Sequence, residues 1–254
     1  MSSAVATRAE VCVVACAEAW RGDGEILASP MGGVVPTAGA RLAKLTFAPD
    51  LLLTDGEAML AADVPALGAR PRVIEGWLPY RRHLALVSGG RRHVMMGASQ
   101  LDRHGNQNIS CVGDWRRPAR QLIGVRGAPA NTLNHPTSYW IPRHSPRVLV
   151  ERVDMVSGVG YDRAAAAGPS AARFHRIPRV VTDLAVLDFE TPDRTMRVRS
   201  LHPGVTAEEV RAATGFPLDV PPDVQRTRDP TAAELRLIRE VLDPAALRDR
   251  EVPA

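Results

Sequence analysis

The stretch Val180-Val-Thr-Asp-Leu-Ala-Val-Leu187 indicates the fold class, because its β-branched and aliphatic residues predict strand structure. A second run of this kind follows at residues 195–201. Behind it, Thr206-x-x-Glu209 is a capping box, in which the two side chains satisfy free amides at the start of a helix. That helix is expected to end at Gly215, a residue type that suits a helix C-terminus. Strands followed by a capped helix indicate an α/β fold.

The same signals extend toward both ends of the chain. Thr7-x-x-Glu10 and Thr231-x-x-Glu234 predict a first and a last helix, and a shorter helix is expected around residues 38–44. Further short strands are predicted at residues 51–54, 72–77, 84–87, 93–96, 121–125 and 148–153. Many strands, with helices gathered toward the two ends, predict an open mixed sheet with helices on both faces.

No repeat and no linker divides the sequence, so residues 1–254 are expected to form a single domain, with the tail from about residue 243 loosely held. A hydrophobic content of 45% is enough to fill one core. No run of about 18 apolar residues predicts a membrane span, and no secretory signal is recognised. The three cysteines are odd in number and scattered, which favours a reducing cytoplasm. Cys12 and Cys16 have helical spacing, but no second pair completes a zinc site.

The net charge of +4 raises the question of nucleic-acid binding, and the residue types argue against it. Of the 32 basic residues only Lys44 is a lysine, and the arginines are spread along the chain instead of forming one block. Aromatic residues, which stack on single-stranded bases, are few and not interleaved with the arginines. We therefore expect no nucleic-acid partner.

Several familiar catalytic motifs are missing from the sequence. Glycine-rich turns occur, but none matches the dinucleotide-binding pattern, and the phosphate-binding P-loop is absent. The seven histidines show no metal-binding spacing, so no metal site is expected. The serine nucleophile elbow is also absent, so Ser-His-Asp catalysis has no support from the sequence.

Four groups of segments follow one another in an order that resembles the β subunit of the class I CoA-transferases. They are Gly97-Ala-Ser-Gln-Leu-Asp102 with Gly105-Asn-Gln-Asn108; Gly124-Val-Arg-Gly-Ala128; Val181-Thr-Asp-Leu-Ala-Val-Leu-Asp188; and Leu201-His-Pro-Gly-Val-Thr-Ala-Glu-Glu-Val210 with Thr214-Gly-Phe216. The resemblance implies an α/β open sheet and a site shared between an α and a β subunit. It also implies that Gly97, Gln100 and Asn106 bind the substrate or its CoA.

The sequence departs from this family where the family carries its catalytic glutamate. Such transferases have Ser-Glu-Asn-Gly after a short apolar strand, whereas this chain has Thr54-Asp-Gly-Glu57. Asp55 is one methylene shorter than glutamate, and Glu57 lies two residues later. Because nucleophilic attack requires close and well-oriented approach, this change puts CoA transfer in doubt. Both residues are kept as candidates for substrate binding, and the alternative for Asp55 is an ordinary turn residue in Asp-Gly.

A second departure is Arg126, which replaces a glycine of the family's Gly-x-Gly-Gly loop. A guanidinium here suits a substrate carboxylate or an enolate, and Gly127 and Ala128 are candidate oxyanion donors. The alternative is that Arg126 pairs with a structural acid. Both departures resemble an actinobacterial branch of hydrolases that open the last steroid ring of a CoA thioester during cholesterol catabolism.

This resemblance implies a cytoplasmic enzyme that cleaves a carbon–carbon bond in a retro-Claisen manner, as part of an α2β2 heterotetramer. Its partner is the α subunit, which would supply the general base, and its substrate is an acyl-CoA. No cofactor is expected, because CoA belongs to the substrate. Two alternatives stay open. The chain could be a true CoA-transferase subunit that uses Asp55 or Glu57, or a subunit without catalytic residues that only completes the CoA cleft.

Overall fold

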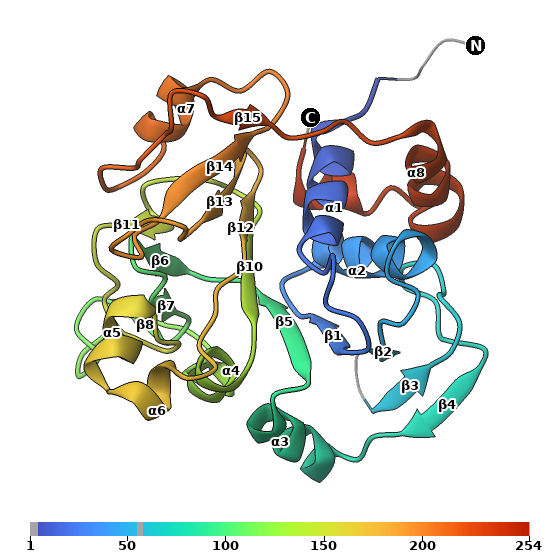
Figure 1. Cartoon of the computed structure of the whole chain (residues 1–254), viewed down its shortest axis with the longest axis horizontal. Helices are drawn as coiled ribbons and strands as arrows, with labels where there is room; N and C mark the ends of the chain where they lie inside the picture. The colour runs from blue at the N-terminus through green and yellow to red at the C-terminus, as the bar shows by residue number, and fades with distance from the viewer. Residues whose placement is uncertain (1–4, 55–57, 254) are drawn as a thin grey trace.

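The computed structural model describes residues 5–54 and 58–253, and a seven-stranded mixed sheet runs through these residues. In sheet order the strands are β1 (Leu27–Pro30), β5 (Arg92–Met96), β10 (Thr137–Ile141), β12 (Val180–Thr182), β13 (Ala185–Asp188), β14 (Arg197–Leu201) and β15 (Gln225–Arg226). The first four are parallel, β13 is antiparallel to both its neighbours, and β15 is parallel to β14. Helices cover both faces (Figure 1), which confirms the predicted architecture.

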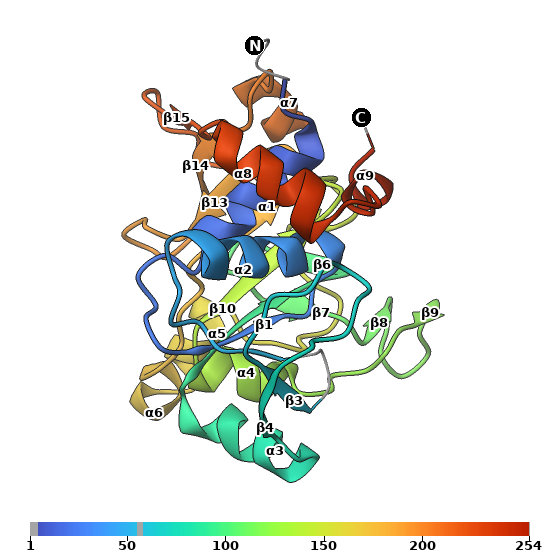
Figure 2. The ribbon, with the colours of Figure 1, turned by 90° about the vertical axis from the view of Figure 1, so that its right-hand side faces the viewer.

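One face is covered by helices from the two ends of the chain. They are α1 (Arg8–Glu18), α2 (Val34–Thr46), α8 (Ala232–Arg236), the π-helical turn η1 (Leu237–Leu242) and α9 (Arg248–Glu251). Figure 2 shows α2 and α8 lying across this face, with α9 at its edge. Gly39 lets α1 and α2 approach closely, because a Cβ there would lie 2.8 Å from the Cys16 Cβ. The first core cluster fills the space between these helices and the sheet.

The opposite face carries short elements packed over a second core cluster. Three short strands pair beside it, β6 (Gln100–Asp102), β7 (Gln107–Asn108) and β11 (Leu149–Val150). The helices on this side are α4 (Ala128–Asn134), α5 (Tyr161–Ala166), α6 (Pro169–Ala172) and α7 (Ala207–Ala212). The predicted capping boxes at Thr7, Thr206 and Thr231 are all formed, with both reciprocal hydrogen bonds, which confirms the three helix starts.

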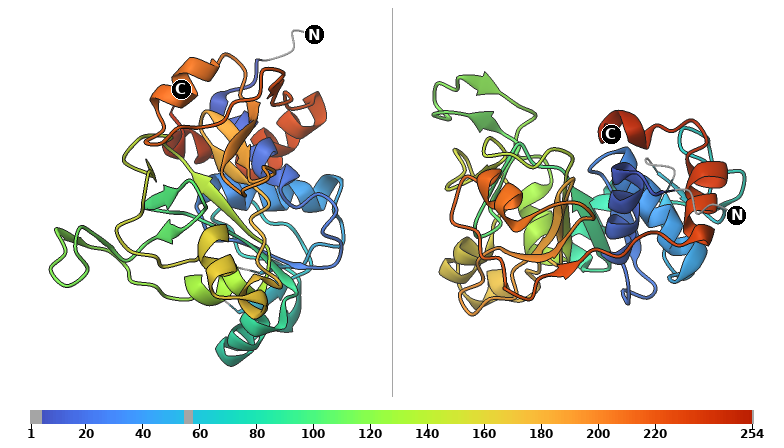
Figure 3. Two further views of the ribbon diagram at one scale, coloured as in Figure 1. Left: turned by 60° about the vertical axis from the view of Figure 1, so that its left-hand side comes forward. Right: turned by 90° about the horizontal axis from the view of Figure 1, so that it is seen from above.

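Two further units project from this body. A small antiparallel sheet of β2 (Leu53–Thr54), β3 (Met59–Ala61) and β4 (Ile74–Trp77) leads into α3 (Tyr80–Gly89). An arm formed by β8 (Cys111–Val112) and β9 (Arg120–Gln121) stands away from the rest of the chain (Figure 3). The strand predicted at residues 84–87 is wrong, since these residues lie in α3. The predicted strand at residues 121–125 pairs only at its first residue.

The strands β1 and β10 are not among the predicted strands, although β10 lies near the middle of the sheet and β1 at its edge. β10 contains Thr137, Ser138 and two buried aromatic residues, Tyr139 and Trp140, so it shows neither alternation nor an aliphatic run. β1 ends in Pro30, and its sequence is typical of a loop. Parallel strands buried on both faces do not need an alternating pattern, which explains the omission.

The C-terminal tail is not loosely held, contrary to the prediction. Asp243 and Arg248 are buried and hydrogen-bonded to each other, with Arg248 Nη1 2.9 Å from Asp243 Oδ2. Glu251 accepts hydrogen bonds from the Val35 amide at 2.7 Å and from the Trp140 indole at 2.9 Å. The tail therefore closes over the start of α2 and the carboxyl end of β10. Within the tail Arg248 pairs with Asp243, and it also pairs with Glu10 of α1.

Candidate active site

The candidate active site lies where the parallel strands end. Leu52 forms an isolated parallel β-bridge with Leu27, so the segment that leads into β2 runs beside β1. At the carboxyl ends of these strands are Thr54, the Met31–Gly33 turn after β1, and Gly97 after β5. The two turns are in contact, because a Cβ on Gly32 would lie 3.4 Å from the Gly97 nitrogen. Open α/β sheets bind their ligands at this edge.

The start of α4 lies at the same edge. Asn134, the last residue of α4, lies near Gly90 before β5, whereas the Asn131 side-chain amide is 3.4 Å from the Met96 sulfur at the end of β5. Hence α4 runs antiparallel to β5, and its first residues reach the carboxyl edge of the sheet. This brings Gly127, which directly precedes α4, to the edge where Gly97 lies. Asp55 and Glu57, which follow Thr54 in the sequence, lie outside the described residues.

Arg126 occupies an unusual backbone conformation in the turn before α4. Its φ is 52°, in the left-handed region, which costs a non-glycine residue about 1–2 kcal/mol. Its side chain is exposed and makes no hydrogen bond or ion pair with any described residue. The alternative that Arg126 pairs with a structural acid therefore finds no partner within residues 5–54 and 58–253. A strained turn that holds a guanidinium in solvent, with no partner among the described residues, is a candidate binding site.

The two amides that follow Arg126 are not equivalent. The Ala128 N–H donates to the Val125 carbonyl at 3.1 Å and closes the turn, and the Ala128 side chain is buried. The Gly127 N–H makes no hydrogen bond to a described residue. Of the two predicted oxyanion donors, Gly127 is thus the one whose N–H is available in this arrangement, while the Ala128 N–H is already used.

Gln100 and Asn106 are buried inside a polar network. Gln100 Oε1 accepts hydrogen bonds from the Asn108 side chain at 2.7 Å and from the Asp154 backbone N–H, and Gln100 Nε2 donates to the Asp154 carboxylate. The Asn106 amide group donates to Asp102 and to Asp162, and its oxygen accepts from the Gly160 N–H at 2.7 Å. These bonds use the polar atoms of both side chains within the chain. The predicted role of Gln100 and Asn106 in binding the substrate or its CoA stays a prediction.

The same network holds the segment that contains Gly97. The Gly97 carbonyl accepts from the Gln107 amide at 2.6 Å, which fixes the turn after β5. Gly160 packs against the turn at residues 104–106, where a Cβ would overlap the His104 carbonyl oxygen. This contact explains the glycine at position 160, and it shows that the start of the 158–170 segment is fixed in place against residues 104–106.

A serine, a histidine and an aspartate form a hydrogen-bonded chain in the core, which no sequence motif indicates. His93 Nε2 lies 2.9 Å from Ser138 Oγ, and His93 Nδ1 lies 2.5 Å from Asp23 Oδ2. The order matches a catalytic triad, but Ser138 and His93 are completely buried in the sheet. A substrate cannot reach this serine, so the chain of bonds serves to join β5 and β10 to the loop before β1.

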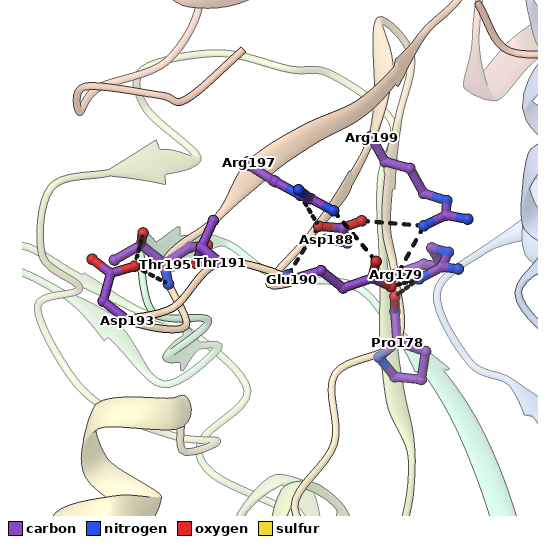
Figure 4. Close-up of polar contacts among 9 residues, drawn as sticks. All are labelled: Pro178, Arg179, Asp188, Glu190, Thr191, Asp193, Thr195, Arg197 and Arg199. Atoms are coloured by element: carbon purple, nitrogen blue, oxygen red, sulfur yellow. Dashed lines mark hydrogen bonds and ion pairs between the residues drawn. The ribbon is translucent and has the colours of Figure 1, made fainter. Parts of the chain in front are cut away.

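A cluster of charged residues lies on β13, β14 and the segments beside them, toward the other edge of the sheet (Figure 4). Asp188 accepts from Arg197 at 2.8 Å and lies 3.3 Å from Arg199. Burial raises the pKa of Asp188, but the hydrogen bonds and charges of its partners together outweigh burial and hold the pKa below its usual value. Glu190 lies 3.6 Å from Arg179. Each arginine of this cluster has a carboxylate partner, whereas Arg126 has none among the described residues, so the cluster is structural.

Metal and thiol chemistry find no site in the described part of the chain. No group of three histidine, cysteine, aspartate or glutamate side chains there could hold a metal ion. Burial raises the pKa of the Cys12 and Cys16 thiols, which lie inside the core around α1 and stay protonated. The described residues also form no helix that is long and apolar enough to cross a membrane.

Comparisons with known proteins agree with this geometry. The chain is 58% identical over 246 residues to the cholesterol ring-cleaving hydrolase IpdB subunit of Rhodococcus jostii, covering 97% of this chain and 96% of the relative. It matches the crystal structure of Rhodococcus jostii IpdAB with a TM-score of 0.94 and 57% identity, over 98% of this chain and 99% of that one. It is also 29% identical over 221 residues to a subunit of the 3-oxoadipate CoA-transferase of Pseudomonas knackmussii, covering 81% of this chain and 82% of that one.

No family model matches the sequence. The identity to the IpdB subunit nevertheless extends over nearly the whole of both chains, and the fold agrees with that of the IpdAB structure. The more distant likeness to a CoA-transferase subunit also covers most of the chain, at lower identity. The chain therefore belongs to the family of IpdB subunits of cholesterol ring-cleaving hydrolases, within the wider group of CoA-transferase-like β subunits.

Proposed function

We propose that this chain is the β subunit of a heteromeric hydrolase that opens the last steroid ring of a CoA thioester in cholesterol catabolism. Its partner is an α subunit, as in the IpdAB structure. We infer that the assembly is an α2β2 heterotetramer in the cytoplasm. The observation that carries the proposal is Arg126, an exposed guanidinium without a partner among the described residues, on a turn at the carboxyl edge of the sheet.

In the proposed reaction, a general base on the α subunit activates water, which adds to a ring ketone. The carbon–carbon bond next to that carbonyl breaks, the carbonyl carbon becomes a carboxylate, and the electron pair moves onto the carbon next to the thioester. The resulting enolate is negatively charged and takes up a proton to complete the step. The reaction needs only water besides the substrate, whose CoA is retained.

Two groups of this chain act on the negative charge. The Arg126 guanidinium binds the enolate or the substrate carboxylate, and its fork suits two oxygens at once. The Gly127 N–H donates to the oxyanion, and a single donor of this kind contributes about 3 kcal/mol to transition-state stabilisation. The exposure of the Arg126 side chain supports this division, as does the Gly127 N–H, which makes no hydrogen bond to a described residue.

The test replaces Arg126 by methionine in the co-purified α/β complex, with a cyclic keto acyl-CoA as substrate. We expect kcat to fall by about 100-fold to 1000-fold while the thermal midpoint stays that of the native complex, because the exposed side chain has no structural partner among the described residues. Arg199→Met is the control, since Arg199 is also partly exposed but pairs with Asp188. Equal kcat in native and R126M complexes removes Arg126 from the mechanism.

A second function, CoA transfer, is kept open by one observation. Asp55 and Glu57 directly follow Thr54 in the sequence, and Thr54 lies at the edge of the sheet where a carboxylate nucleophile would be needed. Mass spectrometry after incubation with acyl-CoA separates the two functions. A CoA ester trapped on either carboxylate indicates transfer, and its absence during turnover indicates hydrolysis by water.

A further inference from the structure

Arg92 is a buried arginine without a carboxylate partner in the part of the chain that the structure describes. It begins β5, and only 7% of the residue is exposed. Its three described hydrogen bonds go to neutral acceptors: Nε to Ser29 Oγ at 2.8 Å, Nη1 to Asn131 Oδ1 at 2.9 Å, and Nη2 to Met31 Sδ at 3.1 Å. No aspartate or glutamate in the described ranges lies within ion-pair distance of it. Burial lowers the pKa of Arg92 to about 10, so the group is still charged at neutral pH.

Arg248 provides the contrast within the same chain. It is as deeply buried as Arg92, but it pairs with Asp243 at 2.9 Å and with Glu10 at 3.1 Å. A buried charge without an opposite charge is costly, because no ion pair compensates for the loss of its hydration. Stability of the fold therefore does not explain the arginine at position 92. The residues that the Arg92 hydrogen bonds connect offer another explanation.

The Arg92 guanidinium joins two sides of the candidate active site. Ser29 and Met31 belong to the end of β1 and the turn after it, while Asn131 lies in α4. The Asn131 N–H donates in turn to the Gly127 carbonyl at 2.9 Å, and the Asn131 side chain lies beside Gly127. A continuous path of hydrogen bonds thus leads from β1 through Arg92 and Asn131 to the residue next to Arg126.

We propose that Arg92 is a positioning residue for ring cleavage, an inference that rests on the proposed function above. Through Asn131 it fixes the Arg126–Gly127 turn relative to the turn after β1, so that the guanidinium and the Gly127 N–H meet the same substrate. Arg92 itself does not touch the substrate. A displacement of about 1 Å in such a turn lowers the rate by about 100-fold, because catalytic hydrogen bonds depend steeply on geometry.

The experiment compares Arg92→Met and Arg248→Met in the co-purified α/β complex, with kcat, KM and the thermal midpoint measured for each. For R92M we expect kcat to fall by about 100-fold, with KM within about threefold and the thermal midpoint unchanged. For R248M we expect a lower thermal midpoint, because Arg248 anchors the C-terminal tail to α1. The kcat per folded complex should stay native. Arg92→Lys keeps the charge but cannot make all three bonds, and it should recover only part of kcat.

A second pair of variants tests the path through Asn131. Asn131→Asp keeps an oxygen for Arg92 and should retain kcat within about threefold, whereas Asn131→Leu should lose as much kcat as R92M. Because the two residues act as one unit, the R92M/N131L double variant should be no slower than either single variant. If the losses of kcat in the two single variants add up in the double variant, Arg92 and Asn131 do not act along one path and the inference is wrong.

The outcomes separate this inference from the proposed function. If the native complex fails to open the ring of a cyclic keto acyl-CoA, the proposed function is wrong. If the native complex is active and R92M keeps native kcat, or if R92M loses activity only in step with its thermal midpoint, the positioning role is wrong and the proposed function stands.

Discussion

Glu10 is the residue whose loss should destabilise this chain most clearly. Its side chain is fully buried and accepts from Arg239 at 2.6 Å and from Arg248 at 3.1 Å, while it also caps α1 through the Thr7 amide at 2.8 Å. Removing the negative charge in Glu10→Gln leaves the two guanidinium groups without their shared partner. Breaking a buried ion pair from one side costs about 3–5 kcal/mol.

The matched control is Glu209, which forms the same capping box with Thr206 but is exposed and pairs with no arginine of the described chain. Glu209→Gln should change the free energy of unfolding by less than about 0.5 kcal/mol, since glutamine also completes a capping box. For a chain of this size each kcal/mol shifts the thermal midpoint by about 2–4 °C, so E10Q should unfold about 6–20 °C lower than the native protein.

The assay is thermal unfolding followed by circular dichroism at equal protein concentration. Burial raises the pKa of Glu10, but the hydrogen bonds from Arg239 and the Thr7 amide and the nearby arginine charges together outweigh burial, so the pKa lies below its ordinary value. The stabilisation by Glu10 is therefore complete above that ordinary value and is lost as the pH falls through the lowered pKa. The reasoning is refuted if E10Q and E209Q unfold at the same temperature at neutral pH.

Two further predictions concern the core and the pH dependence of stability. Gly39→Ala should destabilise the protein by about 1–3 kcal/mol, because the new Cβ would meet Cys16 and the α1 backbone. The control is Gly89→Ala, which should be neutral or slightly stabilising because there is open space around Gly89. Equal urea midpoints for the two variants would contradict the close contact between α1 and α2. His135, His144 and His202 have a pKa lowered to about 4 mainly by burial, so each takes up a proton on unfolding between pH 4 and 6.5. The free energy of unfolding should therefore fall with decreasing pH in this window, by up to about 1.4 kcal/mol per pH unit for each histidine. Urea unfolding at a series of pH values measures this. A free energy of unfolding that does not change with pH would show that these side chains are not buried as neutral groups.

The sequence is most informative where a local signal matches the local structure. The three capping boxes predict three helix starts correctly, because a threonine and a glutamate at this spacing act on nearby amides whatever the rest of the chain does. The strand at residues 84–87 is wrong because Leu84 and Val87 belong to an exposed amphipathic helix, which a short apolar run cannot distinguish from a strand.

The candidate site can be predicted in part. The Gly124–Ala128 segment and Arg126 stand out because a guanidinium replaces a glycine of the resembled family's loop, and the structure places them at the carboxyl edge of the sheet. The roles of Gln100 and Asn106 cannot be inferred from sequence, since only the fold shows that their polar atoms bond to Asp154 and Asp102. Arg92 escapes sequence reasoning for the same kind of reason, because its bonds join residues far apart in the sequence.

The central claim is that water, and not a carboxylate of this chain, attacks the substrate. The most direct measurement is ring opening by the co-purified α/β complex in water labelled with oxygen-18, with the product and the protein both analysed by mass spectrometry. We predict one labelled oxygen in the new carboxylate, CoA retained on the product, and no mass added to the peptide that contains Asp55 and Glu57. A CoA ester on that peptide, with CoA passed to an added carboxylic acid, would contradict the claim.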